Sequence, residues 1–192
     1  PEPAAPPAPK LPKLERAKLS NGLNVILAQR HEIPVVNLSL LVDAGWAADS
    51  LAVPGTAQLA MSMIDEGTAK RTSLQISDEL DSLGASLRAG SNLDLSFVSL
   101  NALKANLDKS LDIWADVVLN PSFPQADFER EQKRQMAAIQ QEKSEPMTMA
   151  TRVLAGLVYG QGHAYAGPLT GSGYEATVKS ITRESLVKFH QT

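Results

Sequence analysis

Three runs of β-forming residues open the patterned part of the chain. They are ERAKLS (15–20), LNVILAQR (23–30) and VVNLSLLVDAG (35–45). The first two flank Asn21-Gly22, and an Asn-Gly pair between extended runs is a strong signal for a β-hairpin. Pro34 separates the hairpin from the third run. We therefore expect a hairpin followed by a central strand.

Helical spacing of apolar positions then predicts two helices. The first covers residues 53–64, where the apolar side chains recur every three or four positions. Thr72 and Gln75 form a capping-box signature at the start of the second helix, and Gly84 is well placed as its C-terminal cap. After this helix, two β-rich segments predict paired strands: ASLRAGS (85–91) and LDLSFVSL (93–100).

The remainder of the pattern is mainly helical. The residues Leu107, Leu111, Trp114 and Val118, spaced by four, three and four, give an apolar stripe. Three further helices are expected: a charged one at about 125–143 with Phe128, Gln132, Gln135 and Ile139 on its inner face, one at 147–158 and one at 183–191. The glycine-rich segment 160–173 is predicted to be a surface loop. This grouping of strands and helices predicts an α+β domain, with helices packed on one face of a mainly antiparallel sheet.

Composition narrows the class of protein. The 192 residues suit one domain, and a net charge of -3 gives no reason to expect a polyanionic partner such as nucleic acid. The absence of cysteine excludes disulfides and thiolate metal sites and leaves the compartment open. No apolar run is long enough to predict a membrane span.

The two ends of the sequence suggest how the domain is bounded. Residues 1–13 contain six prolines and predict an extended inter-domain linker, which leaves 14–192 as the folded domain. The sequence stops at Thr192 inside a helical pattern. We therefore expect an excised piece of a longer chain.

Several short motifs follow one another along the chain. They are LLVDAGWAADS (40–50), PGTAQLAMSMIDEGT (54–68), DELDSLGASLRAGSNLDLSFVSL (78–100), VVLNPSFPQADFEREQ (117–132) and GHAYAGPLTGS (162–172). From about Leu14 to its end, the chain resembles the pitrilysin/insulinase family of zinc peptidases, in its bacterial and mitochondrial-processing branch. The resemblance implies a further closing strand beyond Thr192, so the domain is expected to be truncated before its last strand.

The same resemblance implies that the zinc site has been lost. A hydrolytic zinc site uses three protein ligands and an open position for water. In the family, a His-x-x-Glu-His helix supplies two ligands and the general base, and a later helix supplies a glutamate. These positions correspond here to Gln58, Met61, Ser62 and Ala138. Neutral amide and hydroxyl oxygens are weak zinc ligands, and Met and Ala have no suitable group, so we expect no metal, no cofactor and no catalytic residue.

Other candidate sites have simpler interpretations. His31, His163 and His190 lie in unrelated segments, and each is interpreted as a surface or loop histidine. The neighbouring acids Asp65-Glu66, and likewise those at 78–81, are interpreted as solvated charges. Ser172 lacks the strand-to-helix elbow of a serine hydrolase.

The family resemblance implies a role in peptide hydrolysis without catalysis by this chain. Members resemble a clamshell of two halves, of which one carries zinc. The expected partners are a catalytic half, on the same chain or on a separate subunit, and unfolded peptide. Two alternatives stay open, namely a stand-alone assembly module with this fold and a zinc peptidase with an unusual ligand set. The resemblance also implies the bacterial periplasm or envelope, with the cytoplasm as the alternative.

Overall fold

The computed structural model describes residues 12–51 and 53–191. They belong to two compact units that divide between Pro34 and Val35. The predicted linker over residues 1–13 lies outside the described residues except for Pro12 and Lys13.

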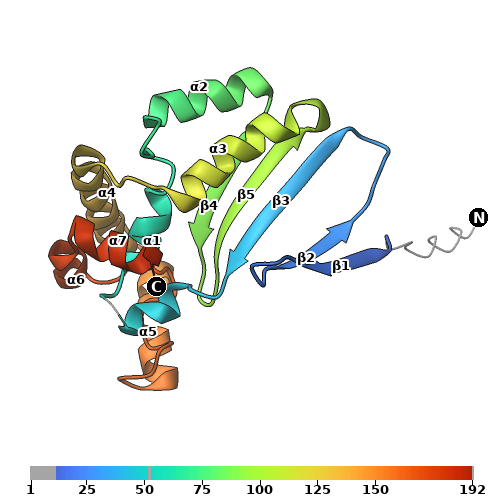
Figure 1. Cartoon of the computed structure of the whole chain (residues 1–192). Helices are drawn as coiled ribbons and strands as arrows, with labels where there is room; N and C mark the ends of the chain where they lie inside the picture. Colours follow the sequence, from blue (N-terminus) through green and yellow to red (C-terminus); the bar gives the residue numbers. More distant parts are fainter. Residues whose placement is uncertain (1–11, 52, 192) are drawn as a thin grey trace, which may run out of the picture. The chain divides into compact units, whose positions relative to one another are not determined.

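The first unit is a two-stranded hairpin, β1 (Leu14–Lys18) and β2 (Asn24–Ala28) (Figure 1). The strands are antiparallel, and their register runs from the Leu14–Ala28 pair to the Lys18–Asn24 pair. Gly22 adopts a φ of 91° in the turn, a conformation that glycine reaches without steric cost. The predicted hairpin is confirmed.

The second unit is built on a three-stranded antiparallel sheet. Its strands are β3 (Val35–Val42), β4 (Ser86–Ser91) and β5 (Ser96–Leu103), in the order β3-β5-β4. Among the described residues, the centre of the sheet is therefore β5, and the prediction that 35–45 would be central is wrong. The sequence of β3 is mainly apolar, interrupted by Asn37 and Ser39, and nothing in it reveals the strand order.

Helices cover one face of this sheet, as predicted for the α+β class. Val98, Leu100 and Ala102 of β5 are buried against α2 (Ser73–Leu83) and α3 (Leu107–Leu119). The middle of the opposite face is polar and carries Asn37, Ser39, Ser86, Arg88, Ser99 and Asn101. Toward the ends of the strands, the same face carries Leu41 and Leu103, which are exposed. The sheet thus has one apolar face in the core and an opposite face that is polar in its middle.

The remaining helices are α1 (Thr56–Ser62), α4 (Gln125–Ser144), α5 (Pro146–Tyr159), α6 (Glu175–Ser180) and α7 (Arg183–Gln191). A second core lies among α1, α4, α6 and α7. Leu59 of α1, Ile139 of α4 and Leu186 of α7 are fully buried in it. Because Met61 belongs to the first core and Leu59 to the second, α1 lies between the two.

Local signals located most element ends correctly. Thr72 and Gln75 make the predicted capping box on α2, and Gly84 is its left-handed C-cap. The sequence pattern did not predict α6 or the two short 3₁₀ helices, Trp46–Leu51 and Lys104–Asn106. Elements of three to six residues carry too few positions for a periodic pattern.

Among the described residues, no helix is both long enough and apolar enough to span a bilayer.

Candidate functional site

Two residues of the helix α1 reach beyond the core. Gln58 and Ser62 are half-buried, whereas every other residue from Thr56 to Ser62 is buried. Residues four apart lie on the same face of a helix. The two positions that the family pattern assigns to histidine ligands are thus the two half-buried residues of α1.

The start of α1 is fixed by a buried carboxylate. Asp49 Oδ2 accepts a hydrogen bond from the Gly55 amide at 2.7 Å, and its Oδ1 accepts one from the Ala57 amide at 2.9 Å. Burial raises the pKa of Asp49 to about 6, although the backbone amides that donate to the carboxylate act to lower it. Gly55 has a φ of 100°, which lets the chain turn sharply into the helix.

Three of the four motif positions meet around one cavity of about 180 Å³. Gln58 and Ser62 line it from α1, and Ala138 lines it from α4. Positions separated by nearly eighty residues are therefore brought to a common site. Their correspondence with the family's zinc ligands stays a prediction, because geometry alone does not assign it.

Met61, the fourth motif position, is only 7% exposed and packs mainly in the first core. It also lines a larger cavity of about 600 Å³ with Gln58 and Ser62. The opposite wall of this cavity includes Arg88, Ala89 and Gly90 of β4. The motif face of α1 is therefore turned toward the strand β4.

The side chains at this site do not fit zinc. Ala138 has no donor atom, and the Ser62 hydroxyl donates to the Leu59 carbonyl oxygen at 2.9 Å. Within residues 12–51 and 53–191, no three His, Cys, Asp or Glu side chains are grouped so that they could hold a metal ion. The positions offer an amide and a hydroxyl where a hydrolytic zinc site needs imidazole or carboxylate.

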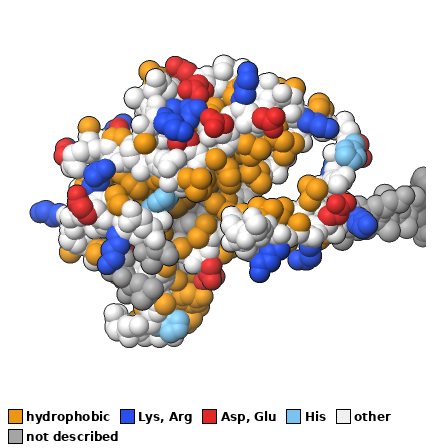
Figure 2. All heavy atoms as spheres, in the orientation of Figure 1, with side chains coloured by type: hydrophobic (Ala, Val, Ile, Leu, Met, Phe, Trp, Pro, Cys, Tyr) orange, Lys and Arg blue, Asp and Glu red, His pale blue; other side chains and the backbone are white. Residues whose placement is uncertain are grey.

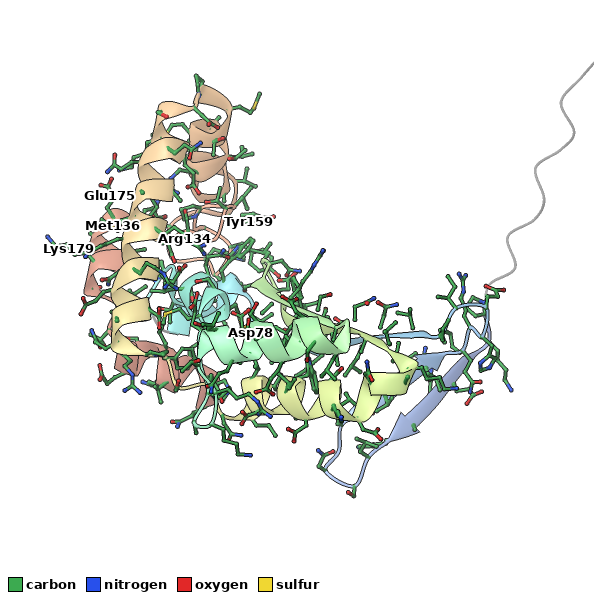
Figure 3. The ribbon with its side chains drawn as sticks, turned by 90° about the horizontal axis from the view of Figure 1, so that it is seen from above. Asp78, Arg134, Met136, Tyr159, Glu175 and Lys179 are labelled. Carbon is green, nitrogen blue, oxygen red and sulfur yellow. The ribbon has the colours of Figure 1, made fainter. Side chains whose placement is uncertain are left out.

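Charged residues that the sequence pattern did not single out border the same cavity. Glu131 is 4% exposed and pairs with Arg134 at 2.6 Å and with Arg130 at 3.3 Å. Arg130 also pairs with Glu66 at 2.7 Å, which connects α4 to the end of the motif segment. Figure 3 shows Arg134 on the α4 ribbon beside α1. The negative charge of the buried Glu131 carboxylate is thus balanced by the guanidinium groups of Arg130 and Arg134.

Asp65 also lies near this charged group. Its pKa is raised, first by burial and then by the neighbouring carboxylates Glu66 and Glu131. Asp65 lines the 600 Å³ cavity together with Arg88 and Arg134. Asp65 is half-buried, and its interpretation as a solvated charge stays a prediction.

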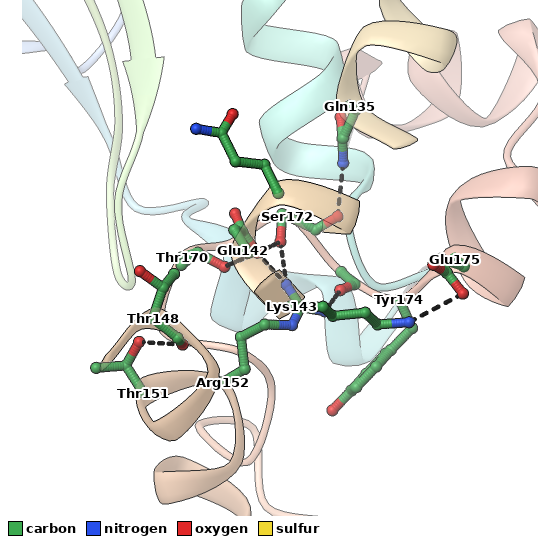
Figure 4. A network of polar contacts seen from close by, with 12 residues as sticks. Gln135, Glu142, Lys143, Thr148, Thr151, Arg152, Thr170, Ser172, Tyr174 and Glu175 are labelled. Carbon is green, nitrogen blue, oxygen red and sulfur yellow. Dashed lines mark hydrogen bonds and ion pairs between the residues drawn. The ribbon is translucent and has the colours of Figure 1, made fainter. Parts of the chain in front are cut away.

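A buried network joins the cavity to α5 (Figure 4). Arg152 forms an ion pair with Glu142, and it donates to Ser172 Oγ and to the Gly173 carbonyl oxygen, both at 2.6 Å. The Ser172 hydroxyl in turn donates to Glu142 at 2.8 Å. Because both charges are paired and hydrogen-bonded, the network satisfies the polar groups that this packing buries.

The loop before α6 was predicted to run over the surface, and its final part does not. Residues 171–173 are buried. Gln135 of α4 donates to the Ser172 carbonyl oxygen at 2.8 Å and to the Gly55 carbonyl oxygen at 3.1 Å. The loop is therefore held between α4 and the start of α1. Its glycine content indicated a loop but not the partners that bury it.

The sequence of α4 contains a spacing that could have indicated several of the residues that line the 180 Å³ cavity. Glu131, Gln135, Ala138 and Glu142 follow one another at intervals of four, three and four, which places them on one helix face. Of the four residues predicted for the inner face, Phe128, Gln135 and Ile139 are buried. Gln132 is half-buried, and Glu131 is buried instead.

The three histidines differ in their exposure. His31 and His163 are exposed, as expected. His190 is half-buried, with its Nε2 atom 2.7 Å from the Val118 carbonyl oxygen. None of them lines either of the two cavities beside α1.

Comparison with known proteins agrees with the arrangement of these elements. The family model described as "Insulinase (Peptidase family M16)" matches residues 24–166. Among solved structures, the chain is similar to a peptidase M16 inactive domain from Pseudomonas fluorescens, with a TM-score of 0.88 and 28% identity. The match covers 93% of this chain and 43% of that one. A protease from Helicobacter pylori shares the fold, with a TM-score of 0.79 and 20% identity over 94% of this chain and 43% of that one.

Curated relatives are matched over most of this chain. A probable mitochondrial-processing peptidase subunit beta from Arabidopsis thaliana is 27% identical over 94% of this chain and 34% of the relative. An uncharacterized zinc protease from Rickettsia felis is 25% identical over 90% of this chain and 41% of the relative. The chain therefore spans well under half the length of these relatives.

Proposed function

Because the chain belongs to the insulinase family of peptidases (family M16), we propose that it is the non-catalytic unit of a zinc metallopeptidase. It would form the peptide-binding chamber together with a catalytic half that carries the zinc. The catalytic half would belong either to the same polypeptide or to a separate subunit.

One observation carries this proposal. The family scaffold is retained, yet the cavity shared by Gln58, Ser62 and Ala138 has no side chain suited to hydrolytic zinc. A Met at the position of the general base cannot accept a proton from water. The likeness to a solved inactive domain of the same family supports the same interpretation.

The geometry also supports a role for the unit in peptide binding. The 600 Å³ cavity between α1 and β4 has a neutral motif face, with Asp65, Arg88 and Arg134 among its lining residues. A wall of this kind offers polar contacts to a peptide without cleaving it. Its contribution is therefore to hold and enclose substrate while hydrolysis takes place in the partner half.

The test compares the chain alone with the chain and its catalytic half. We expect the purified chain to contain less than one-tenth of an equivalent of zinc by elemental analysis and to leave an unstructured fluorogenic peptide uncut. Addition of the chain to the catalytic half is expected to increase peptide cleavage. Stoichiometric zinc or turnover by the chain alone would identify an active peptidase with an unusual ligand set, whereas no effect on the catalytic half would favour a stand-alone assembly module.

The family resemblance is the sole basis for a cellular location. We propose the bacterial periplasm or cell envelope. Fractionation of cells that produce the parent protein, followed by immunoblotting against this chain, tests the proposal. Recovery in the cytoplasmic fraction would exclude it.

A further inference from the structure

Arg88 differs from the other arginines of the second unit. It is exposed on β4, and within residues 12–51 and 53–191 its guanidinium has no hydrogen bond or ion pair. The other arginines of this unit are all bound to carboxylates or to backbone carbonyl oxygens, namely Arg71, Arg130, Arg134, Arg152 and Arg183. A guanidinium carries five N–H donors in one plane, and two of them match the two oxygens of a carboxylate. Arg88 is therefore free to bind an anionic group.

Arg88 lies beside two cavities. It lines the 600 Å³ cavity between α1 and β4, and it lines a second cavity of about 530 Å³ over the polar face of the sheet. The other polar groups of that face bind one another. Asn101 donates to Asn37 Oδ1 at 2.5 Å, and the hydroxyl oxygens of Ser39 and Ser99 are 2.8 Å apart. The Arg88 guanidinium is thus the group that this face leaves available to a ligand.

The 600 Å³ cavity also has an apolar wall. Phe97 of β5 and Gly90 of β4 both line it, and they pair across the two strands. A Cβ atom at position 90 would lie 2.9 Å from Phe97 Cζ, so glycine leaves room for the ring. Residues two apart on a strand lie on the same face, which places Arg88 next to this ring. The cavity therefore combines a cation with an apolar surface.

We propose that the 600 Å³ cavity binds a carboxylate group of the peptide through the Arg88 guanidinium. The carboxylate belongs to an acidic side chain or to the C-terminus of the peptide, since both present the same pair of oxygens. Phe97 would pack against the carbon atoms next to that group. This inference rests on the proposed function and names the class of peptide that the unit holds.

The surrounding charges favour one carboxylate over a polyanion. Asp65 lines the same cavity, and Glu66 and Glu131 lie close enough to act on its pKa, which is raised first by burial. These acids would repel a ligand with many negative charges, such as a nucleic acid. Figure 2 shows basic and acidic side chains interspersed over the described part of the face in view. The guanidinium of Arg88 balances a single negative charge.

The test uses four versions of one unstructured peptide with a fluorescent label at its N-terminus. The first has an aspartate in its middle and an amidated C-terminus, and the second has asparagine there and a free C-terminus. The third has both carboxylates, and the fourth has neither. We expect the purified chain to bind the third peptide about fivefold more tightly than the fourth in fluorescence anisotropy, the effect of one partly exposed charge pair. The first two peptides show which carboxylate is bound.

Variants of the chain assign this preference to the cavity. Arg88→Gln should abolish it, and Arg88→Lys should retain part of it, because lysine keeps the charge without the planar donors. Asp65→Asn should strengthen binding of the third peptide, because it removes a negative charge from the same cavity. Arg16→Gln is the matched control, since Arg16 is exposed on β1 and is not among the residues that line either cavity. Equal thermal unfolding of the variants would show that they act on binding.

The outcomes separate the inference from the proposed function. Equal binding of the four peptides, binding of none, or a preference that survives Arg88→Gln would each overturn the inference. The proposed function is judged by another measurement, the effect of the chain on cleavage by the catalytic half. An increase in cleavage that is equal for the four peptides would leave that function standing without the carboxylate site. Displacement of the third peptide by inorganic phosphate more readily than by acetate would also overturn the inference, in favour of a phosphate site.

Discussion

Asp49 shows how one buried side chain can make the stability of the domain depend on pH. Its carboxylate accepts backbone hydrogen bonds at the start of α1, and burial raises its pKa to about 6 from an ordinary value of 3.8. Between about pH 4 and pH 6 the folded state holds a proton that the unfolded state has lost. The free energy of unfolding contributed by this group therefore falls as the pH rises through that window.

The substitution Asp49→Asn tests this assignment. Asn does not titrate, so the variant does not lose stability as Asp49 ionises. Relative to the unmodified protein, the free energy of unfolding of Asp49→Asn should therefore rise by about 2–3 kcal/mol between pH 4 and pH 7. Urea unfolding followed by circular dichroism at several pH values measures it. Asp49→Ala serves as a control, because it also loses the helix cap and should cost about 1 kcal/mol even at pH 4. A difference that does not vary with pH would mean that Asp49 titrates normally.

Gly173 illustrates a second constraint at the residue scale. It has a φ of +74°, and a Cβ atom placed there would lie 2.3 Å from the Pro54 carbonyl oxygen. Gly173→Ala should lower the free energy of unfolding by more than about 3 kcal/mol, because both the backbone conformation and the contact are unfavourable.

Gly162 is the matched control for that prediction. Its φ is +87°, and nothing lies within 4 Å of its Cβ position. Gly162→Ala should cost only the conformational strain, about 1 kcal/mol. Thermal and urea unfolding of the two variants give the comparison. Equal destabilisation would show that the contact with Pro54 is relieved by a small shift.

Some of the residues that fix the structure could be predicted from their neighbours in sequence, and others could not. The Thr72–Gln75 box and the Gly84 cap involve neighbours in sequence, so the pattern alone located them. Asp49 accepts hydrogen bonds from amides six and eight residues further along, and it lies in a short 3₁₀ helix that no periodic pattern predicts. Ser172 is bound by residues 20 and 30 positions away, a relation that exists only in the folded chain.

At the scale of elements, Arg71 connects the segment after α1 to the helices α2 and α3 through ion pairs. Its guanidinium pairs with Asp116 at 2.8 Å, and with Glu79 and Asp112 at 3.0 Å each. Burial acts to raise the pKa of Asp116, but hydrogen bonds from Thr68, Asn120 and Arg71 outweigh it and the pKa is lowered. The stabilisation from Asp116 is thus present at neutral pH and lost in acid.

Removal of Arg71 is therefore expected to be costly. Arg71→Ala should reduce the free energy of unfolding by about 3 kcal/mol at pH 7, because it leaves the buried carboxylate of Asp116 without its cation. Asp112→Asn removes only a partner whose side chain is 70% exposed, and it should cost less than about 1 kcal/mol. Urea unfolding at pH 7 measures both. A similar small loss for the two variants would mean that water replaces the guanidinium at Asp116.

Element types were predicted more successfully than their arrangement. The run from 35 to 42 was correctly identified as a strand, because its residues are β-formers between turn signals. Among the described residues it lies at the edge of the sheet, where it pairs with β5 about sixty residues later, and no local pattern encodes that choice.

For the whole molecule, the candidate site depends on bringing α1 and α4 together. The motif comparison predicted four positions, and the structure places Gln58, Ser62 and Ala138 around one cavity. The motif comparison did not predict the charged residues that border this cavity. Their place there depends on how α4 packs, and the spacing of residues along α4 was their one signal in the sequence. We propose that this scaffold folds without zinc ligands at the motif positions, and a variant that introduces such ligands tests the assignment of those positions.

Introduction of zinc ligands at the motif positions is the most direct test of that assignment. The variant Gln58→His, Met61→Glu, Ser62→His and Ala138→Glu places two imidazoles and a carboxylate around the 180 Å³ cavity, which is the ligand set of a hydrolytic zinc site. We expect this variant to bind about one equivalent of zinc by elemental analysis, whereas the unmodified chain should bind none. In the control, Ala137→Glu replaces Ala138→Glu, because Ala137 is adjacent in sequence but is not among the residues that line the cavity. Equally tight zinc binding by the control, or none by either variant, would show that Ala138 does not correspond to the third ligand position.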